Sequence, residues 1–120
     1  MKLLSRTEEM ILLSVFTLGE KAYGLAIRGH LNEVSGKRFS VGAVYVPLER
    51  LEDKGMLLSH EAEPTPERGG RSKRYYRLTA KGKEALEEIR VLHAALWKGY
   101  ASSEEAQSFA VSALPGNGFL

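Results

Sequence analysis

The 120-residue sequence contains no cysteine, and no run of apolar residues in it reaches the roughly 18 that a membrane-spanning helix needs. The absence of cysteine excludes disulfide frameworks, thiolate zinc sites and cysteine nucleophiles. The first nine residues, MKLLSRTEE, carry charges that interrupt the apolar stretch a secretory signal requires. We therefore expect a cytoplasmic protein that has no membrane partner.

Catalytic and metal-binding patterns are missing as well. His30, His60 and His93 lie on separate predicted elements, without the spacing of metal ligands. No arrangement of serine, histidine and acid stands out, and no glycine-rich loop follows a strand to hold a phosphate. We expect neither an enzyme nor a protein with a metal or another cofactor.

The charged residues are distributed unevenly along the chain. The formal net charge is only +2, but residues 68–83 contain seven lysines and arginines and no acid, which leaves a net charge of −5 on the rest. A chain of this length usually forms one domain. The basic segment is therefore one positive region of a small domain, and it indicates an anionic partner.

The first half of the chain predicts three short helices between residues 5 and 54. Ser5 and Glu8 fit a capping box, and the helix that follows is apolar on nearly all sides, as is typical of an enclosed helix. The next two helices each have one apolar stripe. The stripe residues are Gly24, Ile27, Leu31 and Val34 in the second helix and Val41, Val44, Leu48 and Leu51 in the third. A glycine ends each of the three helices, at Gly19, Gly36 and Gly55.

The pattern then changes to a β-hairpin followed by a long helix. Residues 56–63 and 73–79 predict two strands, with Tyr76 and Leu78 on one face, and the connection rich in proline and glycine forms a basic tip. A helix of about 20 residues begins at Thr79 or Ala80. Its apolar seam consists of Leu86, Ile89, His93, Leu96 and Tyr100. We expect residues 101–120 to form a flexible tail.

This order of elements is that of a winged helix-turn-helix, a mainly α (α+β) fold with a two-stranded wing. Gly42, Ala43 and Tyr45 face outward at the start of the third helix, where free amides favour phosphate. Duplex DNA is therefore the predicted partner. The candidate DNA contacts are Lys37, Arg38, Ser40, Gly42, Ala43 and Tyr45 around the recognition helix 40–54, and Arg68, Gly70, Arg71, Lys73 and Arg74 in the wing 64–74. Tyr23 and Gly24 are assigned to packing, since glycine admits a close neighbour.

Four motifs together resemble the PadR family of bacterial transcriptional regulators. They are YGLAI at 23–27, SVGAVY at 40–45, LERLEDKGM at 48–56 and RGGRSKRYYRLTAKG at 68–82. The resemblance implies a dimeric repressor with a DNA-binding domain (residues 1–79), a dimerisation helix (residues 80–100) and release from its operator when an effector binds. Members commonly place proline directly after the tyrosine that corresponds to Tyr45, whereas here Val46 intervenes, so we expect Pro47 to bend the helix.

A dimer with recognition helices about 34 Å apart would read an inverted repeat. The dimer-interface candidates are Leu86, Ile89, His93, Leu96, Trp97 and Tyr100. Some relatives bind planar aromatic compounds at such an interface, which makes Trp97 a candidate contact for a small aromatic effector, although plain packing is the commoner role of an interface tryptophan. Two alternatives stay open: a winged-helix module that binds a partner protein, and one that binds structured RNA.

Overall fold

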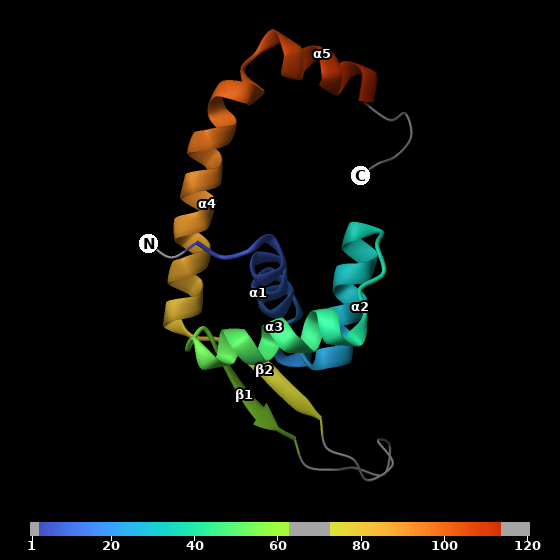
Figure 1. The fold of residues 1–120 in the computed structure, drawn as a ribbon, viewed down its shortest axis with the longest axis vertical. Coiled ribbons are helices and arrows are strands. Elements are labelled where there is room, and N and C mark those ends of the chain that lie inside the picture. The colour runs from blue at the N-terminus through green and yellow to red at the C-terminus, as the bar shows by residue number, and fades with distance from the viewer. Residues whose placement is uncertain (1–2, 63–72, 114–120) are drawn as a thin grey trace. The chain divides into compact units, whose positions relative to one another are not determined.

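A computed structural model describes residues 3–62 and 73–113 of the chain. The elements in order are α1 (Arg6–Leu18), the one-turn 3₁₀ helix η1 (Gly19–Lys21), α2 (Gly24–Ser35), α3 (Val41–Asp53), β1 (Leu57–Glu61), β2 (Arg74–Leu78), α4 (Ala80–Ala101) and α5 (Glu104–Ala113) (Figure 1). The chain divides into two compact units, Met1–Glu87 and Glu88–Leu120, and α4 continues from the first into the second.

The core of the first unit is formed by α1, α2, α3 and the hairpin. Its fully buried apolar side chains are Ile11, Leu12, Val15, Ile27, Val44, Leu48, Leu51 and Leu57. The two strands are antiparallel, with Leu57 opposite Leu78 and Glu61 opposite Arg74. Tyr76 and Leu78 are both buried, as the alternation predicts. The predicted fold is thus confirmed: a mainly helical winged helix-turn-helix with a two-stranded wing and a long C-terminal helix.

The helices begin and end where local signals predict. Ser5 Oγ accepts a hydrogen bond from the Glu8 amide at 3.1 Å, and Glu8 Oε1 accepts one from the Ser5 amide at 2.9 Å, which confirms the capping box. The three helix-ending glycines adopt positive φ angles: Gly19 at 59°, Gly36 at 71° and Gly55 at 79°. Glycine adopts this backbone conformation without the steric cost that other residues incur.

Four apolar side chains predicted to be buried lie on the surface instead. Val34 and Val41 are exposed although the rest of their stripes is buried, because they lie in the last turn of α2 and the first turn of α3, at the ends of the helices. Leu13 and Phe16 are exposed as well. The prediction that α1 is enclosed on all sides is therefore wrong: its packing partners leave one side of this helix uncovered.

Residues 101–120, where the sequence predicts a flexible tail, contain helix α5. Ser103 Oγ accepts a hydrogen bond from the Ala106 amide at 3.1 Å and so caps its start. Two glutamates occupy the first turn, where the helix dipole favours negative charge. Serines, glycines and Pro115 suggested the tail, but Ser103 caps a helix that continues to Ala113, so serine content does not mark an unstructured segment here. Pro115 and the glycines lie outside the described residues.

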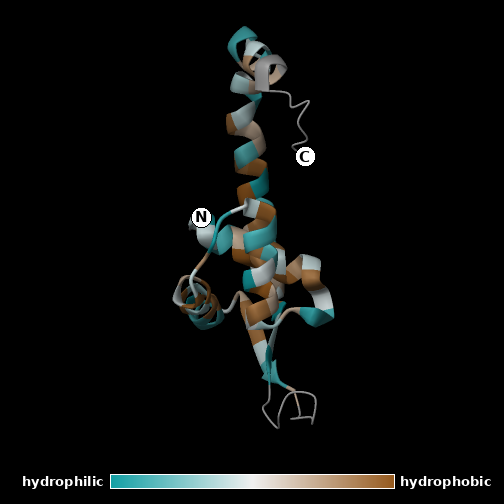
Figure 2. Ribbon diagram, turned by 90° about the vertical axis from the view of Figure 1, so that its right-hand side faces the viewer, coloured by the Kyte–Doolittle hydropathy of each residue, from teal (hydrophilic) through white to brown (hydrophobic). Residues whose placement is uncertain are grey.

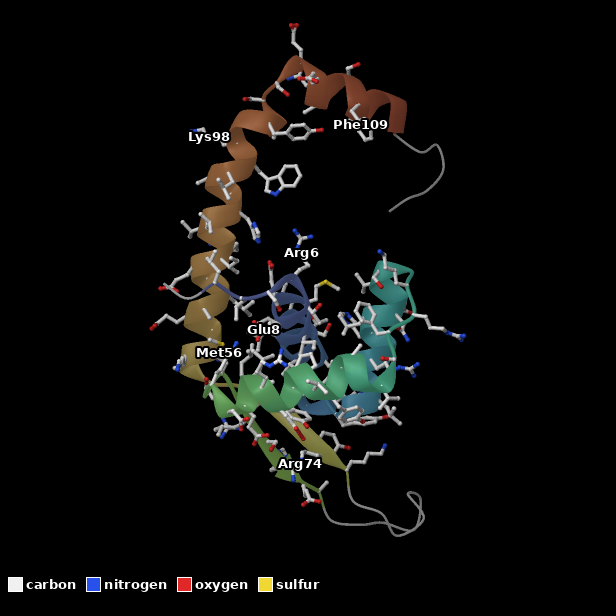
Figure 3. The ribbon with its side chains drawn as sticks, viewed as in Figure 1. Arg6, Glu8, Met56, Arg74, Lys98 and Phe109 are labelled. Carbon is white, nitrogen blue, oxygen red and sulfur yellow. The ribbon has the colours of Figure 1, made fainter. Side chains whose placement is uncertain are left out.

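An ion pair joins α1 to the C-terminal end of α3. Lys54 Nζ lies 2.7 Å from Glu8 Oε2, and Glu8 is only 5% exposed (Figure 3). Burial acts to raise the pKa of Glu8. Hydrogen bonds from Lys54 and Ser5, together with the charge of Lys54, outweigh burial, so that the pKa of this carboxyl lies below its ordinary value.

Substitution of Glu8 by glutamine is expected to lower the free energy of unfolding by about 2 kcal/mol near pH 7. Glutamine retains the helix cap but loses the ionic bond to Lys54. Because the pKa of Glu8 is lower in the folded chain, its contribution is complete above the ordinary pKa of 4.5 and is lost as the pH falls through the lowered value. Urea unfolding at stepwise lower pH should therefore show a steeper loss of stability for the natural chain than for Glu8→Gln. Parallel pH profiles would contradict this assignment.

Candidate nucleic-acid interface

The turn that leads into α3 is held by side chains from α2. Arg28 Nε donates to the Phe39 carbonyl at 2.6 Å, and the Phe39 amide donates to Asn32 Oδ1 at 2.7 Å. Ser40 Oγ then accepts from the Ala43 amide at 3.1 Å and caps α3, as predicted. These bonds fix the start of α3 relative to α2. Arg28 and Asn32 were not among the predicted site residues. Their spacing of four places them on one side of a helix, but it does not show which loop their side chains contact.

The N-terminal half of α3 presents small, exposed residues. Gly42, Ala43 and Val46 are exposed, and so are Lys37 and Arg38 in the preceding turn. Nothing lies within 4 Å of the position that a Cβ atom on Gly42 would occupy, and its φ is not positive. The fold therefore does not require glycine here. The missing side chain leaves the free amides at the helix start open to a close anionic partner.

Tyr45 lies partly inside the fold instead of facing fully outward as predicted. It is half-buried, and a Cβ atom on Gly24 would overlap its hydroxyl and ring atoms. Glycine at the start of α2 therefore makes room for this ring. The packing role predicted for Gly24 involves an aromatic side chain, and Tyr45 keeps only part of its surface available to a partner.

Pro47 lies inside α3, and the helix continues through it to Asp53. Proline has no N–H, so it cannot donate to the Ala43 carbonyl one turn earlier. Ala43 is exposed, so that water can satisfy this carbonyl. The recognition helix is thus one helical element on both sides of Pro47, and the expected bend stays a prediction.

The two basic residues at the base of the wing face opposite sides of the hairpin. Lys73 Nζ lies 3.9 Å from the centroid of the Tyr23 ring. Arg74 Nη1 donates to Ser59 Oγ at 2.9 Å, and Arg74 Nη2 lies 3.7 Å from Glu61 Oε1 (Figure 3). Successive side chains of an extended segment alternate between faces, which accounts for the different surroundings of the two cations. The other wing candidates, Arg68, Gly70 and Arg71, lie outside the described residues.

The dimer-interface candidates on α4 differ in exposure. Ile89 is buried within the single chain, and Leu86 and His93 are half-buried. We call the other three the aromatic patch: Leu96, Trp97 and Tyr100, which are 67%, 58% and 50% exposed. The patch lines a hollow of about 340 Å³, and the rings of Trp97 and Tyr100 meet edge to face with centroids 5.4 Å apart. Figure 2 shows apolar and polar residues alternating along α4.

Residues 3–62 and 73–113 contain no cluster of three or more potential metal ligands. Within the same ranges, no helix combines the length and the apolar character needed to cross a bilayer. Among the predicted site residues that the structure describes, the small and basic ones around the start of α3, Arg74 and the aromatic patch are exposed, whereas Lys73 and Tyr45 are partly buried.

Three helices, a capped and exposed third helix and a basic wing define a winged helix-turn-helix protein. Residues 12–88 match the family described as "Transcriptional regulator PadR-like family". The chain belongs to this family, which consists of DNA-binding transcriptional regulators and not of enzymes. The predicted family is therefore confirmed.

Several solved structures are similar to this chain. A PadR family transcriptional regulator from Eggerthella lenta is 28% identical, with 77% of this chain and 78% of that chain covered and a TM-score of 0.62. A PadR-like transcription factor from Bacteroides fragilis is 26% identical, with 79% and 89% covered and a TM-score of 0.64. A PadR family regulator from Clostridium difficile is 26% identical, with 81% and 95% covered and a TM-score of 0.59. None of the curated proteins that were compared matches the chain.

Proposed function

We propose that this regulator represses transcription as a homodimer that binds an inverted-repeat operator in duplex DNA. The start of α3 carries the proposal, because Gly42 is exposed and the fold does not require glycine there. Small side chains allow the helix to enter a major groove closely, and its amides and dipole favour phosphate oxygens. A dimer bound upstream of a gene represses it by obstructing RNA polymerase.

The DNA contacts divide between the recognition helix and the wing. Ser40, Gly42, Ala43 and the exposed part of Tyr45 enter the major groove, while Lys37 and Arg38 neutralise phosphates beside it. Along the wing, Arg68, Gly70, Arg71 and Lys73 follow the backbone or a minor groove. Arg74 remains a candidate, but we expect the smallest effect from its loss because its guanidinium already has Ser59 and Glu61 as partners.

We propose that residues 1–79 bind DNA and that the helix over residues 80–100 forms the dimer. The aromatic patch supports this division, because exposed clusters of large apolar side chains mark interaction surfaces and aromatic residues are enriched in interface cores. Ile89 is already buried within one chain, so it adds little to an interface between two chains. Recognition helices held about 34 Å apart would face successive major grooves.

Trp97 is proposed primarily as a packing residue of the dimer and secondarily as an effector contact. The hollow beside it, about 340 Å³, lies at the small end of the range for ligand sites, about 300–1,000 Å³. The side chains of the described residues that line it are apolar or aromatic, which suits a small planar aromatic compound. Such a compound would weaken operator binding if it altered the packing between the two α4 helices.

Substitution of both Arg71 and Lys73 by alanine tests DNA binding. If a dimer neutralises about six phosphates, a plot of log affinity against log salt has a slope near −5, and loss of about four contacts should reduce it to about −2. Fluorescence anisotropy with a duplex from the region upstream of the gene measures the slope, and footprinting on the same DNA should reveal an inverted repeat. If the double substitution leaves the slope unchanged, the proposal is contradicted. If structured RNA displaces the protein from the duplex better than unlabelled DNA does, RNA is favoured as the partner.

A further inference from the structure

Lys73, at the base of the wing, is held by an aromatic ring instead of an acid. Its Nζ atom lies 3.9 Å from the centroid of the Tyr23 ring, within the distance at which an ammonium is attracted to the negative face of an aromatic ring. Among the described residues, no acid forms an ion pair with Lys73. The ammonium therefore has a preferred position while it keeps its full positive charge.

The Tyr23 ring is fixed by contacts that do not involve Lys73. Tyr23 and Tyr75 form an antiparallel β-bridge, and the Tyr76 amide donates to the Ala22 carbonyl at 2.8 Å. The Tyr23 and Tyr75 rings meet edge to face with centroids 5.5 Å apart. Tyr75 in turn stacks on His60, with the centroids 5.8 Å apart and the planes 18° from parallel. The backbone and these rings thus join the start of α2 to the wing and hold Tyr23 in place.

Arg74, the neighbouring cation in the wing, differs from Lys73 because oxygen atoms already surround its guanidinium. The hydroxyl of Ser59 accepts a hydrogen bond from Arg74 at 2.9 Å and donates one to Glu52 Oε2 at 2.6 Å. Glu61 Oε1 lies 3.7 Å from Nη2 of the same guanidinium. A phosphate that binds Arg74 must compete with these oxygens. A phosphate that binds Lys73 competes with an uncharged ring, so the charge of Lys73 is more available to DNA.

We propose that Tyr23 is a positioning residue for DNA binding, which acts by holding the Lys73 ammonium where a phosphate approaches. This inference rests on the proposed function, because it requires Lys73 to contact DNA. A free lysine side chain samples many rotamers, and ordering it on binding lowers affinity. The Tyr23 ring restricts that motion before DNA arrives without neutralising the charge.

Substitutions at position 23 test whether the ring acts through Lys73. The probe is a fluorescent duplex of arbitrary sequence and about 30 base pairs, because phosphate contacts do not depend on sequence. We expect Tyr23→Leu to weaken binding about fivefold and Tyr23→Phe, which keeps the ring, to remain within about twofold of the natural chain. In a Lys73→Met background, Tyr23→Leu should cause no further loss. A full additional loss in that background would show that Tyr23 only stabilises the wing, and would overturn the inference.

A second pair of variants keeps the test valid if Tyr23→Leu unfolds the domain. Trifluorophenylalanine at position 23 has nearly the shape of phenylalanine but a much weaker negative ring face. It should bind the duplex less tightly than Tyr23→Phe, and equal affinities would overturn the inference. His60→Leu is the control for a loosened ring cluster: it removes a ring contact from Tyr75 but keeps the Tyr23 ring beside Lys73, so we expect it to weaken binding much less than Tyr23→Leu does.

Acetylation of the free protein gives a readout that is independent of DNA. Site-resolved mass spectrometry should show faster modification of Lys73 in Tyr23→Leu than in the natural chain, with Lys21 and Lys98 as unchanged references. If Lys73→Met weakens duplex binding but Tyr23→Leu changes neither acetylation nor affinity, the inference fails and the proposed function stands. If Lys73→Met leaves binding unchanged, Lys73 does not contact DNA, and both this inference and that part of the proposed function fail.

Discussion

Substitution of Gly42 by leucine is expected to weaken operator binding about 100-fold while the free energy of unfolding stays the same or rises. Nothing within 4 Å would meet the first atom of a new side chain, so the folded domain accommodates it. Glycine within a helix is less favourable than alanine by about 0.5–1 kcal/mol, a cost that the substitution removes. At the DNA surface, leucine would hold the helix away from the groove. A loss of about 1–3 kcal/mol in each of two half-sites gives the expected change in affinity.

Gly29 provides the matched control for Gly42. It is also an exposed helical glycine with nothing within 4 Å of its Cβ position, but it lies on α2 and outside the proposed contacts. Urea unfolding should give the two leucine variants similar stabilities, while anisotropy with operator DNA should show a loss for Gly42→Leu alone. Gly42→Ala should fall between the natural chain and Gly42→Leu. If both leucine variants bind as the natural chain does, the start of α3 does not face DNA.

The sequence predicted those parts of the fold that depend on residues close together in the chain. The capping box joins Ser5 to Glu8 three residues later, and Ser40 caps a helix whose amide at Ala43 is equally near. The alternation that buries Tyr76 and Leu78 is likewise a property of one strand. Such short-range patterns leave few alternative structures, and for this reason the order of elements and the position of the recognition helix could be predicted.

The rest of the candidate site depends on contacts between distant parts of the chain. The position of Lys73 over Tyr23 arises only when the wing meets the start of α2, and no spacing in the sequence encodes that meeting. The periodicity of α3 marked Val41 as buried like Val44, but the first turn of the helix is exposed. Whether Arg74 faces DNA or the acids of its own wing likewise required the register of the two strands. The sequence thus predicted the chemical type of each candidate side chain, but it did not predict which residue that side chain contacts.

Substitution of Leu96 by aspartate is expected to dissociate the proposed dimer, raising its dissociation constant by about 100-fold or more. Leu96 is 67% exposed in the single chain and lies beside Trp97 and Tyr100, so an interface that covers the aromatic patch would bury it. Burial of a leucine side chain contributes about 1.5–3 kcal/mol. In a twofold symmetric interface the substitution occurs twice, and each introduced carboxylate would also have to leave water. Sedimentation equilibrium measures the change.

Ala95→Asp is the control that separates the aromatic patch from the helix itself. Ala95 is exposed on the same helix and lies one, two and five positions before the three residues of the patch, so it does not share their face and this variant should remain dimeric. Affinity for the complete operator should fall when the dimer dissociates, because in the dimer the second recognition helix is tethered to the first and binds its half-site at a high effective concentration. Leu96→Asp should therefore bind an isolated half-site as the natural chain does, but lose most of its preference for the complete inverted repeat. A monomeric Leu96→Asp that kept this preference would show that the two half-sites are not bridged through α4, and the aromatic patch would then require another partner.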